Sequence, residues 1–287
     1  MRTALLLVLV LVLAGCCRTG NCIPSRESCR SPVVEDDCPR RLAEATRALA
    51  YQVSALLDRA KAHPDEGERR RSQALVDLLI PVVKGWSTEA GIQAASLGVQ
   101  VHGGMGFIEE TGAAQHLRDA RISTIYEGTT GIQANDLVGR KVGREAGATM
   151  KTLIADMRKV QAEAAAAGSG DADLRAIGAR LAKAIEALER ATDWIVTVYP
   201  DDPGAVAAGS VYYLKLAGLA VGGWMMTRAA IAATALLASG GGDETYLRGK
   251  RLTARFYADH LLPQIGGLAE SLVSGGKIVS GAEEALL

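Results

Sequence analysis

One acidic side chain in the middle of the chain has neighbours that suit contact with a ligand. Glu127 lies between Tyr126 and Gly128, and the glycine allows the backbone to approach a bound molecule closely. Two threonines follow, and either could cap a helix that begins near Gly131. A carboxylate held in this way could act as a general base if water were excluded from it. The alternative is a surface glutamate that precedes a helix cap.

A second glycine-rich segment, Gln100–Phe107, precedes this run. Its pair Gly103-Gly104 is expected to end the preceding helix, because glycine favours helix C-termini. A short basic helix over residues 113–122 separates the two segments. The sequence therefore predicts two glycine-containing loops around one short helix, and a helix that begins after the second loop could offer N–H groups to an anionic or polar ligand.

These motifs resemble those of the flavin-dependent acyl-CoA dehydrogenases, and more closely those of the subgroup with an added C-terminal helical domain. The run Tyr126–Thr129 is similar to the catalytic-base motif of the family, and Gln100–Phe107 is similar to its flavin-contacting loop. The resemblance covers roughly residues 38–287. Several motifs in the correct order make it more specific than a lone Gly-x-Gly pattern.

The resemblance implies oxidation of an acyl-CoA thioester to a 2,3-enoyl-CoA. A carboxylate removes the proton next to the thioester carbonyl, and the neighbouring carbon delivers a hydride to FAD. This reaction needs a base over one face of the substrate, exclusion of water, and donors at the thioester oxygen, where negative charge develops. By resemblance, Glu127 is the predicted base and Gly128 is a predicted substrate contact.

The same resemblance implies a cofactor and partners. FAD is expected to contact Gln100, Gly103 and Gly104 in the first loop, and Thr129 and Gly131 in the second. Many family members have glutamine at the position of Gly131, whereas Gly131 itself could contact FAD only through its backbone. In the family, the first loop touches FAD held mainly by a neighbouring subunit. The expected partners are thus an acyl-CoA, an electron transfer flavoprotein and further copies of the same chain.

The composition argues against several other classes of protein. The chain has 32 basic and 32 acidic residues, so it carries no basic excess of the kind that binds nucleic acid. Its four histidines are scattered, and the spacing predicts no metal site. Apolar residues make up 48% of the sequence, which is ample for a buried core.

Apolar residues recur at helical spacing through most of the chain, and no strand alternation persists. Pro81 should kink or restart the second helix, and Pro263 should bend the last one. Lys215 and Arg228 interrupt the most apolar segment, which predicts a buried helix or helix pair and not a membrane span. Helices are expected over residues 41–62, 72–101, 113–122, 131–142, 148–167, 171–198, 205–238 and 246–274.

The predicted fold class is all-α. A helical bundle similar to the C-terminal domain of the family is expected over residues 39–145, and a second helical domain over residues 146–287. A complete family member also has an N-terminal helical domain and a middle β domain, neither of which is found in this sequence. We therefore expect a truncated member that keeps the catalytic base and has few of the walls around it.

Residues 1–38 resemble an export signal followed by an irregular segment. Arg2 precedes the short apolar run Ala4–Leu13, and Leu13–Cys16 is similar to a lipoprotein cleavage box. All five cysteines lie between Cys16 and Cys38, whereas the cysteine-free remainder suits a reducing compartment. One interpretation is an interrupted reading frame ahead of a cytoplasmic enzyme fragment. The second is an exported, lipid-anchored helical protein that reuses the fold for binding, and a third is a chain that pairs with a separately encoded N-terminal half.

Overall fold

The computed structural model describes residues 34–280 of the chain. Within this range the regular elements are all helical, which confirms the predicted fold class. The predicted export signal lies outside the described residues. The first helix, α2 (Val34–Ala62), begins earlier than expected and includes the last residues of the segment predicted to be irregular.

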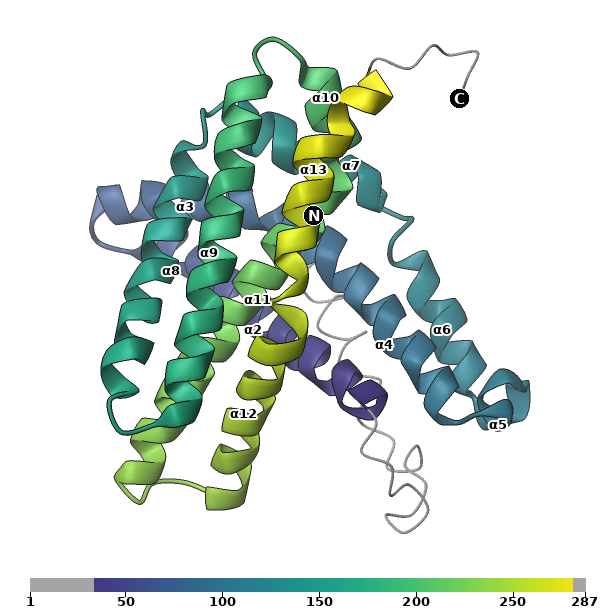
Figure 1. Cartoon of the computed structure of the whole chain (residues 1–287), viewed down its shortest axis with the longest axis vertical. Helices are drawn as coiled ribbons and strands as arrows, with labels where there is room; N and C mark the ends of the chain where they lie inside the picture. The colour runs from purple at the N-terminus through teal and green to yellow at the C-terminus, as the bar shows by residue number, and fades with distance from the viewer. Residues whose placement is uncertain (1–33, 281–287) are drawn as a thin grey trace.

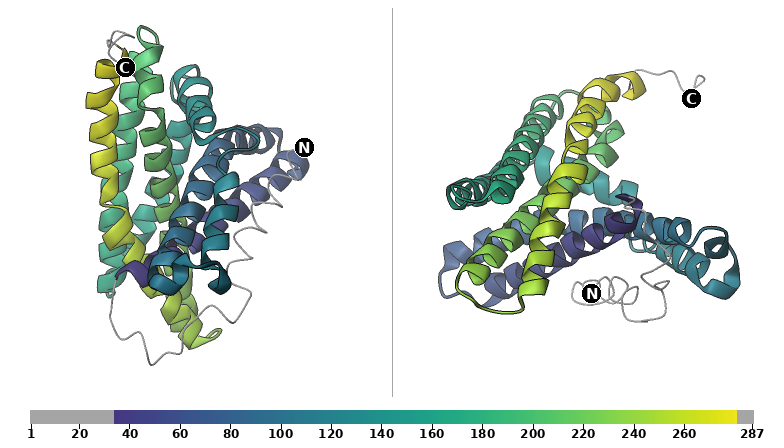
Figure 2. Two further views of the ribbon diagram at one scale, coloured as in Figure 1. Left: turned by 90° about the vertical axis from the view of Figure 1, so that its right-hand side faces the viewer. Right: turned by 60° about the horizontal axis from the view of Figure 1, so that its bottom comes forward.

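After the 29-residue helix α2, the first half of the described chain consists of shorter helices that change type or direction often. Figure 1 shows that α4, α5 and α6 form an arm that projects from the main body, and the right-hand view of Figure 2 agrees. After α2, the elements are α3 (Glu66–Pro81), η1 (Val82–Trp86), α4 (Ser87–Val101), α5 (Gly104–Phe107), η2 (Glu109–Thr111), α6 (Ala113–Ile122), α7 (Thr130–Asn135) and η3 (Asp136–Gly143).

The second half consists of longer helices that run side by side with α11 among them (Figure 1). A single cluster of buried apolar residues continues from Leu42 to Leu272, so the two ranges predicted as separate domains share one core. The elements are α8 (Ala148–Ala167), α9 (Ala172–Val198), α10 (Pro203–Ala208), α11 (Ser210–Ala238), α12 (Glu244–Phe256), η4 (Tyr257–Leu261) and α13 (Gln264–Ser280).

Side-chain caps define where many of these helices begin. Asp65, Asp171, Asp202 and Asp243 each accept a backbone N–H from the first turn of the helix that follows. Such a cap satisfies a donor that has no partner within the helix and is worth about 1 kcal/mol. The cap at Asp65 explains why α3 begins at Glu66, before the expected Ser72.

Three segments are π-helical: η1, η3 and η4. The first begins directly after Pro81, so the predicted restart of the helix takes the form of a change from α- to π-geometry. The third ends shortly before Pro263, where the chain turns into α13. Short π-helical segments widen the helix locally and are frequent at functional sites.

The helix α11 is the centre of the core. By length and composition it could cross a membrane, but 78% of its most apolar window is buried inside the structure. Glycines on its surface allow close packing, because a Cβ atom at Gly218 would lie 2.1 Å from Cγ of Trp86. A Cβ atom at Gly222 would lie 2.3 Å from the hydroxyl of Tyr257, which donates a hydrogen bond to the carbonyl of Leu219. Two of the π-helical segments therefore pack directly on the backbone of α11.

This packing predicts opposite effects for two Gly→Ala substitutions. We expect Gly218→Ala to lower the free energy of unfolding by about 1–3 kcal/mol, because the added methyl overlaps the Trp86 ring. Gly266→Ala in α13 is the matched control, since its Cβ would meet no atom within 4 Å. It should leave stability unchanged or raise it by about 0.5 kcal/mol. Urea unfolding of both variants checks this, and equal effects would contradict the packing described here.

Candidate functional site

The loop that carries Glu127 joins α6 to α7 at the base of the projecting arm. Glu127 has a φ of 51° and Gly128 a φ of 98°, so that two consecutive residues adopt the left-handed region. Among the described non-glycine residues, Ala146 is the other with positive φ. For a residue with a Cβ atom this conformation costs about 1–2 kcal/mol. Such strain is found most often at functional sites, where the surrounding structure enforces it.

Gly128 is required by its surroundings as well as by its backbone. A Cβ atom there would lie 2.7 Å from Nε2 of Gln133. The same Nε2 donates to the carbonyl of Glu127 at 3.5 Å. Any larger residue at position 128 would therefore displace a side chain that contacts the loop.

Several hydrogen bonds fix the end of the loop. The backbone N–H of Thr130 donates to the carbonyl of Thr124 at 3.2 Å, and its hydroxyl donates to Oε1 of Glu89 at 2.6 Å. The hydroxyl of Thr129 accepts the N–H of Ile132 at 3.3 Å. Of the two threonines that could cap this helix, Thr129 is thus the N-cap of α7.

A buried lysine forms hydrogen bonds to the backbone of the same loop. Lys84, in η1, is only 2% exposed, and its Nζ donates to the carbonyl of Ser123 at 3.0 Å and to that of Gly128 at 2.5 Å. The ammonium also lies 5.6 Å from the centre of the Tyr126 ring, within range of a cation–π interaction. Burial lowers the pKa of Lys84, while the negative charges of Glu127 and Glu89 oppose that effect.

No motif in the sequence marks Lys84 as a site residue. The residue lies in a segment of otherwise apolar character, Leu78–Trp86, and a lone lysine there was a usable signal. Lysine is rarely buried unless its ammonium finds partners, so a lysine within a core segment indicates polar acceptors nearby. Those acceptors are carbonyls some forty residues later in the chain, and local sequence patterns do not reveal them.

Glu127 itself is exposed, and so are several apolar side chains close to it in the chain. The exposed fractions are 55% for Ile122, 49% for Ile125 and 60% for Ile132. A carboxylate becomes a stronger base when water is excluded from it. For Glu127 to act as a base, something must therefore exclude water from this exposed loop. The exposed apolar residues suit burial under a substrate, a cofactor or another protein surface.

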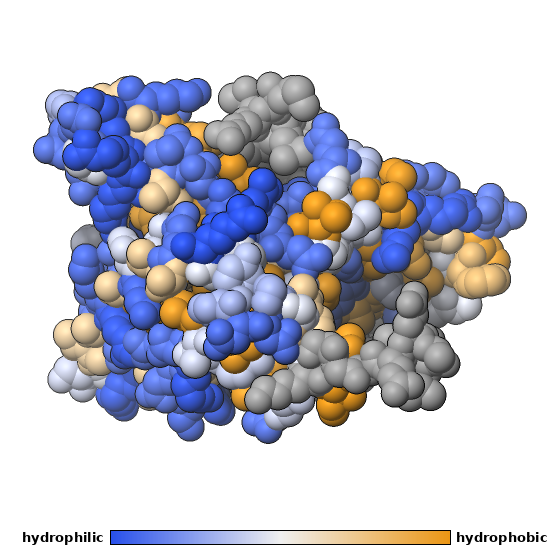
Figure 3. Space-filling model, turned by 90° about the horizontal axis from the view of Figure 1, so that it is seen from above, coloured by the Kyte–Doolittle hydropathy of each residue, from blue (hydrophilic) through white to orange (hydrophobic). Residues whose placement is uncertain are grey.

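The first glycine-rich loop lies at the far end of the arm. Gln100, Gly103 and Gly104 are exposed, and a Cβ atom on either glycine would meet nothing within 4 Å. Nearby Met105 and Phe107 are exposed too, and Figure 3 shows hydrophobic side chains at the tip of the arm. This open backbone could receive a flat or polar ligand, so the residues present fit a contact with part of a dinucleotide.

The two groups of residues expected to contact FAD do not meet within one chain. Thr129 and Gly131 adjoin Glu127, whereas Gln100, Gly103 and Gly104 lie beyond the ten residues of α6. A helix of that length spans about 15 Å. In α6, Arg118 forms a local ion pair, in which it donates to Oε1 of Glu109 at 2.8 Å. This pair fixes the connection between the arm tip and the helix.

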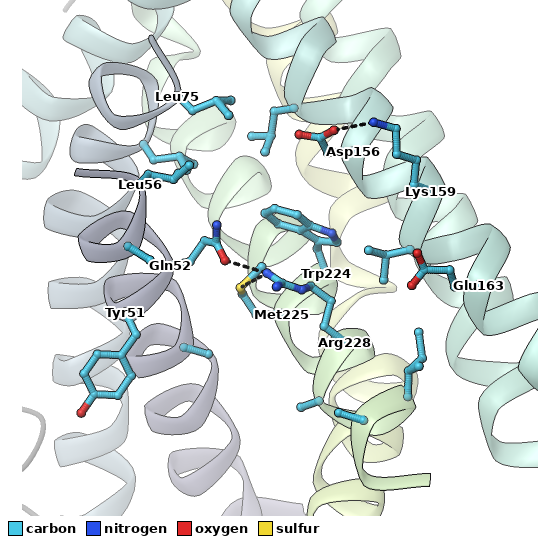
Figure 4. Close-up of a pocket in the computed structure, with 18 of the residues that line it drawn as sticks. Tyr51, Gln52, Leu56, Leu75, Asp156, Lys159, Glu163, Trp224, Met225 and Arg228 are labelled. Carbon is cyan, nitrogen blue, oxygen red and sulfur yellow. Dashed lines mark hydrogen bonds and ion pairs between the residues drawn. The ribbon is translucent and has the colours of Figure 1, made fainter. Parts of the chain in front are cut away.

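A separate groove lies between α2, α3, α8 and α11 (Figure 4). It has a volume of about 820 Å³ and contains no residue of either loop. Arg228 donates to Oε1 of Gln52 at 2.7 Å, and Arg71 forms an ion pair with Asp156 across the groove. Asp156 also pairs with Lys159, so the charge of that carboxylate is compensated within the groove. The groove holds none of the predicted site residues, and the Glu127 loop remains the better candidate for chemistry.

Two family models match successive parts of the chain. The model described as "Acyl-CoA dehydrogenase, C-terminal domain" matches residues 31–142, and "Acetyl-CoA dehydrogenase C-terminal like" matches residues 150–282. A solved acyl-CoA dehydrogenase complexed with FAD from Bacillus anthracis superposes with a TM-score of 0.66 at 18% identity. That superposition covers 98% of this chain and 49% of the other, and at this identity it supports the fold alone.

Curated relatives extend the similarity at higher identity. The 3-methylmercaptopropionyl-CoA dehydrogenase of Ruegeria pomeroyi is 46% identical over 223 residues, which are 78% of this chain and 37% of the relative. The broad-specificity linear acyl-CoA dehydrogenase FadE5 of Mycobacterium tuberculosis is 32% identical over 237 residues, or 79% of this chain and 38% of the relative. The chain thus spans less than two fifths of the length of these relatives.

The strained backbone at position 127 makes a prediction about stability. At an ordinary exposed helix position such as Glu186, the Glu186→Gly variant should have a free energy of unfolding about 1 kcal/mol lower than that of Glu186→Ala. At Glu127 the order should be reversed or the difference lost, because glycine relieves the left-handed strain. The four variants are compared by urea unfolding. A normal alanine preference at position 127 would show that the loop is not strained.

Proposed function

Because this chain belongs to the acyl-CoA dehydrogenase family, whose C-terminal helical regions it matches, we propose that it supplies the general base for α,β-dehydrogenation of an acyl-CoA thioester. The product is the 2,3-enoyl-CoA. The observation that carries the proposal is the enforced left-handed backbone at Glu127 and Gly128, in a loop held by buried contacts on one side and open on the other.

In this mechanism the carboxylate of Glu127 accepts the proton from the carbon next to the thioester carbonyl. No ion pair engages this carboxylate within residues 34–280, so its oxygens are available to the substrate. The backbone N–H of Glu127 also makes no hydrogen bond within that part of the chain and can donate to the thioester oxygen. A donor at that atom stabilises the negative charge that develops as the proton leaves.

FAD, when bound, supplies the acceptor for the hydride equivalent from the adjacent carbon. Thr129 and Gly131 are the residues that would contact it next to Glu127. Gln100, Gly103 and Gly104 would contact it from the tip of the arm. Helix α6 separates these two groups of residues. We therefore propose that the arm tip of one copy of the chain contacts the FAD held by a second copy. The proposed active form is thus a homo-oligomer.

The base must be covered to act, and the exposed isoleucines beside it indicate where the cover lies. The relatives are more than twice as long as the aligned region, so their acyl-CoA sites can draw on further protein surface. We propose that Glu127 works beneath such a surface, in the cytoplasm, with an electron transfer flavoprotein as the final acceptor.

The role of Glu127 is tested by Glu127→Gln in the flavin-loaded protein. The amide is nearly the same size but cannot accept a proton, so turnover of an acyl-CoA should fall at least 1,000-fold while bound flavin is retained. Glu110→Gln, an exposed glutamate on the arm, is the matched control and should behave like the parent. The measurement is acyl-CoA-dependent flavin reduction, and undiminished reduction by Glu127→Gln would remove the residue from this role.

The substrate class is tested with a panel of thioesters. Because this chain is 46% identical to the Ruegeria enzyme, we propose that its substrate has a short acyl chain that can contain sulfur. We expect kcat/KM for 3-methylmercaptopropionyl-CoA to exceed that for palmitoyl-CoA at least tenfold, since extra methylenes that do not fit cost about 1–3 kcal/mol. Butyryl-CoA serves as the sulfur-free control of similar length. Preference for the long chain would contradict this assignment.

A further inference from the structure

We propose that Lys84 is a positioning residue, which holds the catalytic carboxylate in place through the backbone of its loop. This inference rests on the proposed function of Glu127. It goes further, because it states how a residue from a distant part of the sequence fixes the position of the Glu127 carboxylate.

The two hydrogen bonds of Lys84 lie on either side of Glu127 in the chain. One carbonyl, that of Ser123, is where α6 ends, and the other, that of Gly128, follows the base directly. A single ammonium thus joins the start and the end of the turn. Because the carbonyl of Gly128 is held, the backbone between it and Ser123 is restrained in the conformation that gives Glu127 its positive φ.

Lys84 is itself fixed to the core by the two residues that follow it. The next residue, Gly85, packs so tightly that a Cβ atom would lie 2.6 Å from Cδ2 of Leu214 in α11. Trp86 then fills the space over Gly218 and Gly222 of the same helix. The π-helical geometry of η1 places these residues against α11 and turns the lysine toward the loop. The position of Glu127 therefore depends, through η1, on the largely buried helix α11.

Holding the loop by its backbone leaves the reactive group free. Within residues 34–280, no ion pair joins Lys84 to Glu127, although the ammonium is close enough for the two charges to interact. The charge of Lys84 is compensated at short range by two carbonyl dipoles and the face of Tyr126, and at longer range by the negative charges of Glu127 and Glu89. A direct ion pair would engage the oxygens of Glu127, whereas this arrangement keeps them available to accept a proton.

The first test measures the loop itself in the full chain. Lys84→Met keeps the length of the side chain and removes the ammonium, and it should raise hydrogen exchange at the amides of Tyr126 and Thr130 at least tenfold. Lys215→Met, which changes an exposed lysine of α11, is the matched control and should leave exchange in the loop unchanged. Should Lys84→Met not fold, Lys84→Gln, which keeps one donor, takes its place. Unchanged protection of residues 123–130 in a folded variant would overturn the proposal.

The second test separates positioning from general stability. In the flavin-loaded protein, Lys84→Met should lower kcat per bound flavin about 10–100-fold and change KM much less, because a small displacement of the base costs rate but little binding. A lysine with a purely structural role would lower the amount of folded, flavin-bound protein and leave kcat per flavin intact, which would also overturn the proposal.

The two proposals can fail independently. Glu127→Gln with full turnover would reject the base, yet the exchange experiment would still report whether Lys84 holds the loop. Conversely, an inactive Glu127→Gln together with unaltered exchange and unaltered kcat per flavin in Lys84→Met would keep the base and reject the positioning role.

Discussion

The hydrogen bonds from one buried ammonium to two loop carbonyls connect the candidate base with the core of the protein. Without them, the left-handed backbone at Glu127 would depend on the contacts of Thr130 with Thr124 and Glu89 and on the long hydrogen bond from Gln133. A charge this deeply buried requires dipoles close to it. The carbonyls that satisfy Lys84 are also the ones that shape the loop, so the stability of the lysine and the geometry of the site depend on the same contacts.

The position of that lysine depends in turn on α11. Small residues along this helix let the π-helical segments approach its backbone, where an added Cβ atom would overlap Trp86 or Tyr257. Because η1 cannot move relative to α11 without opening this contact, a change in the core would be felt at the loop. One continuous core across both family-matched regions makes such coupling possible.

The projecting arm differs from α11 because it leaves much of its tip exposed. Its helices leave apolar side chains and open glycine backbone at the tip, away from Glu127. Contacts useful to one long cofactor are thus distributed over two places that a single copy does not bring together. This separation is the physical reason why a neighbouring copy belongs in the proposed function.

The sequence by itself determined the helical fold class and the identity of the two loops. It also indicated a helix cap at Thr129 or Thr130, because periodicity, capping and glycine placement act over a few residues. The structure shows that Thr129 is the cap. Tertiary structure alone decided the burial of Lys84, the π-helical form of η1 and the distance between the two loops. Each of these depends on contacts between residues far apart in the chain, and no local pattern encodes which distant carbonyl a lysine will meet.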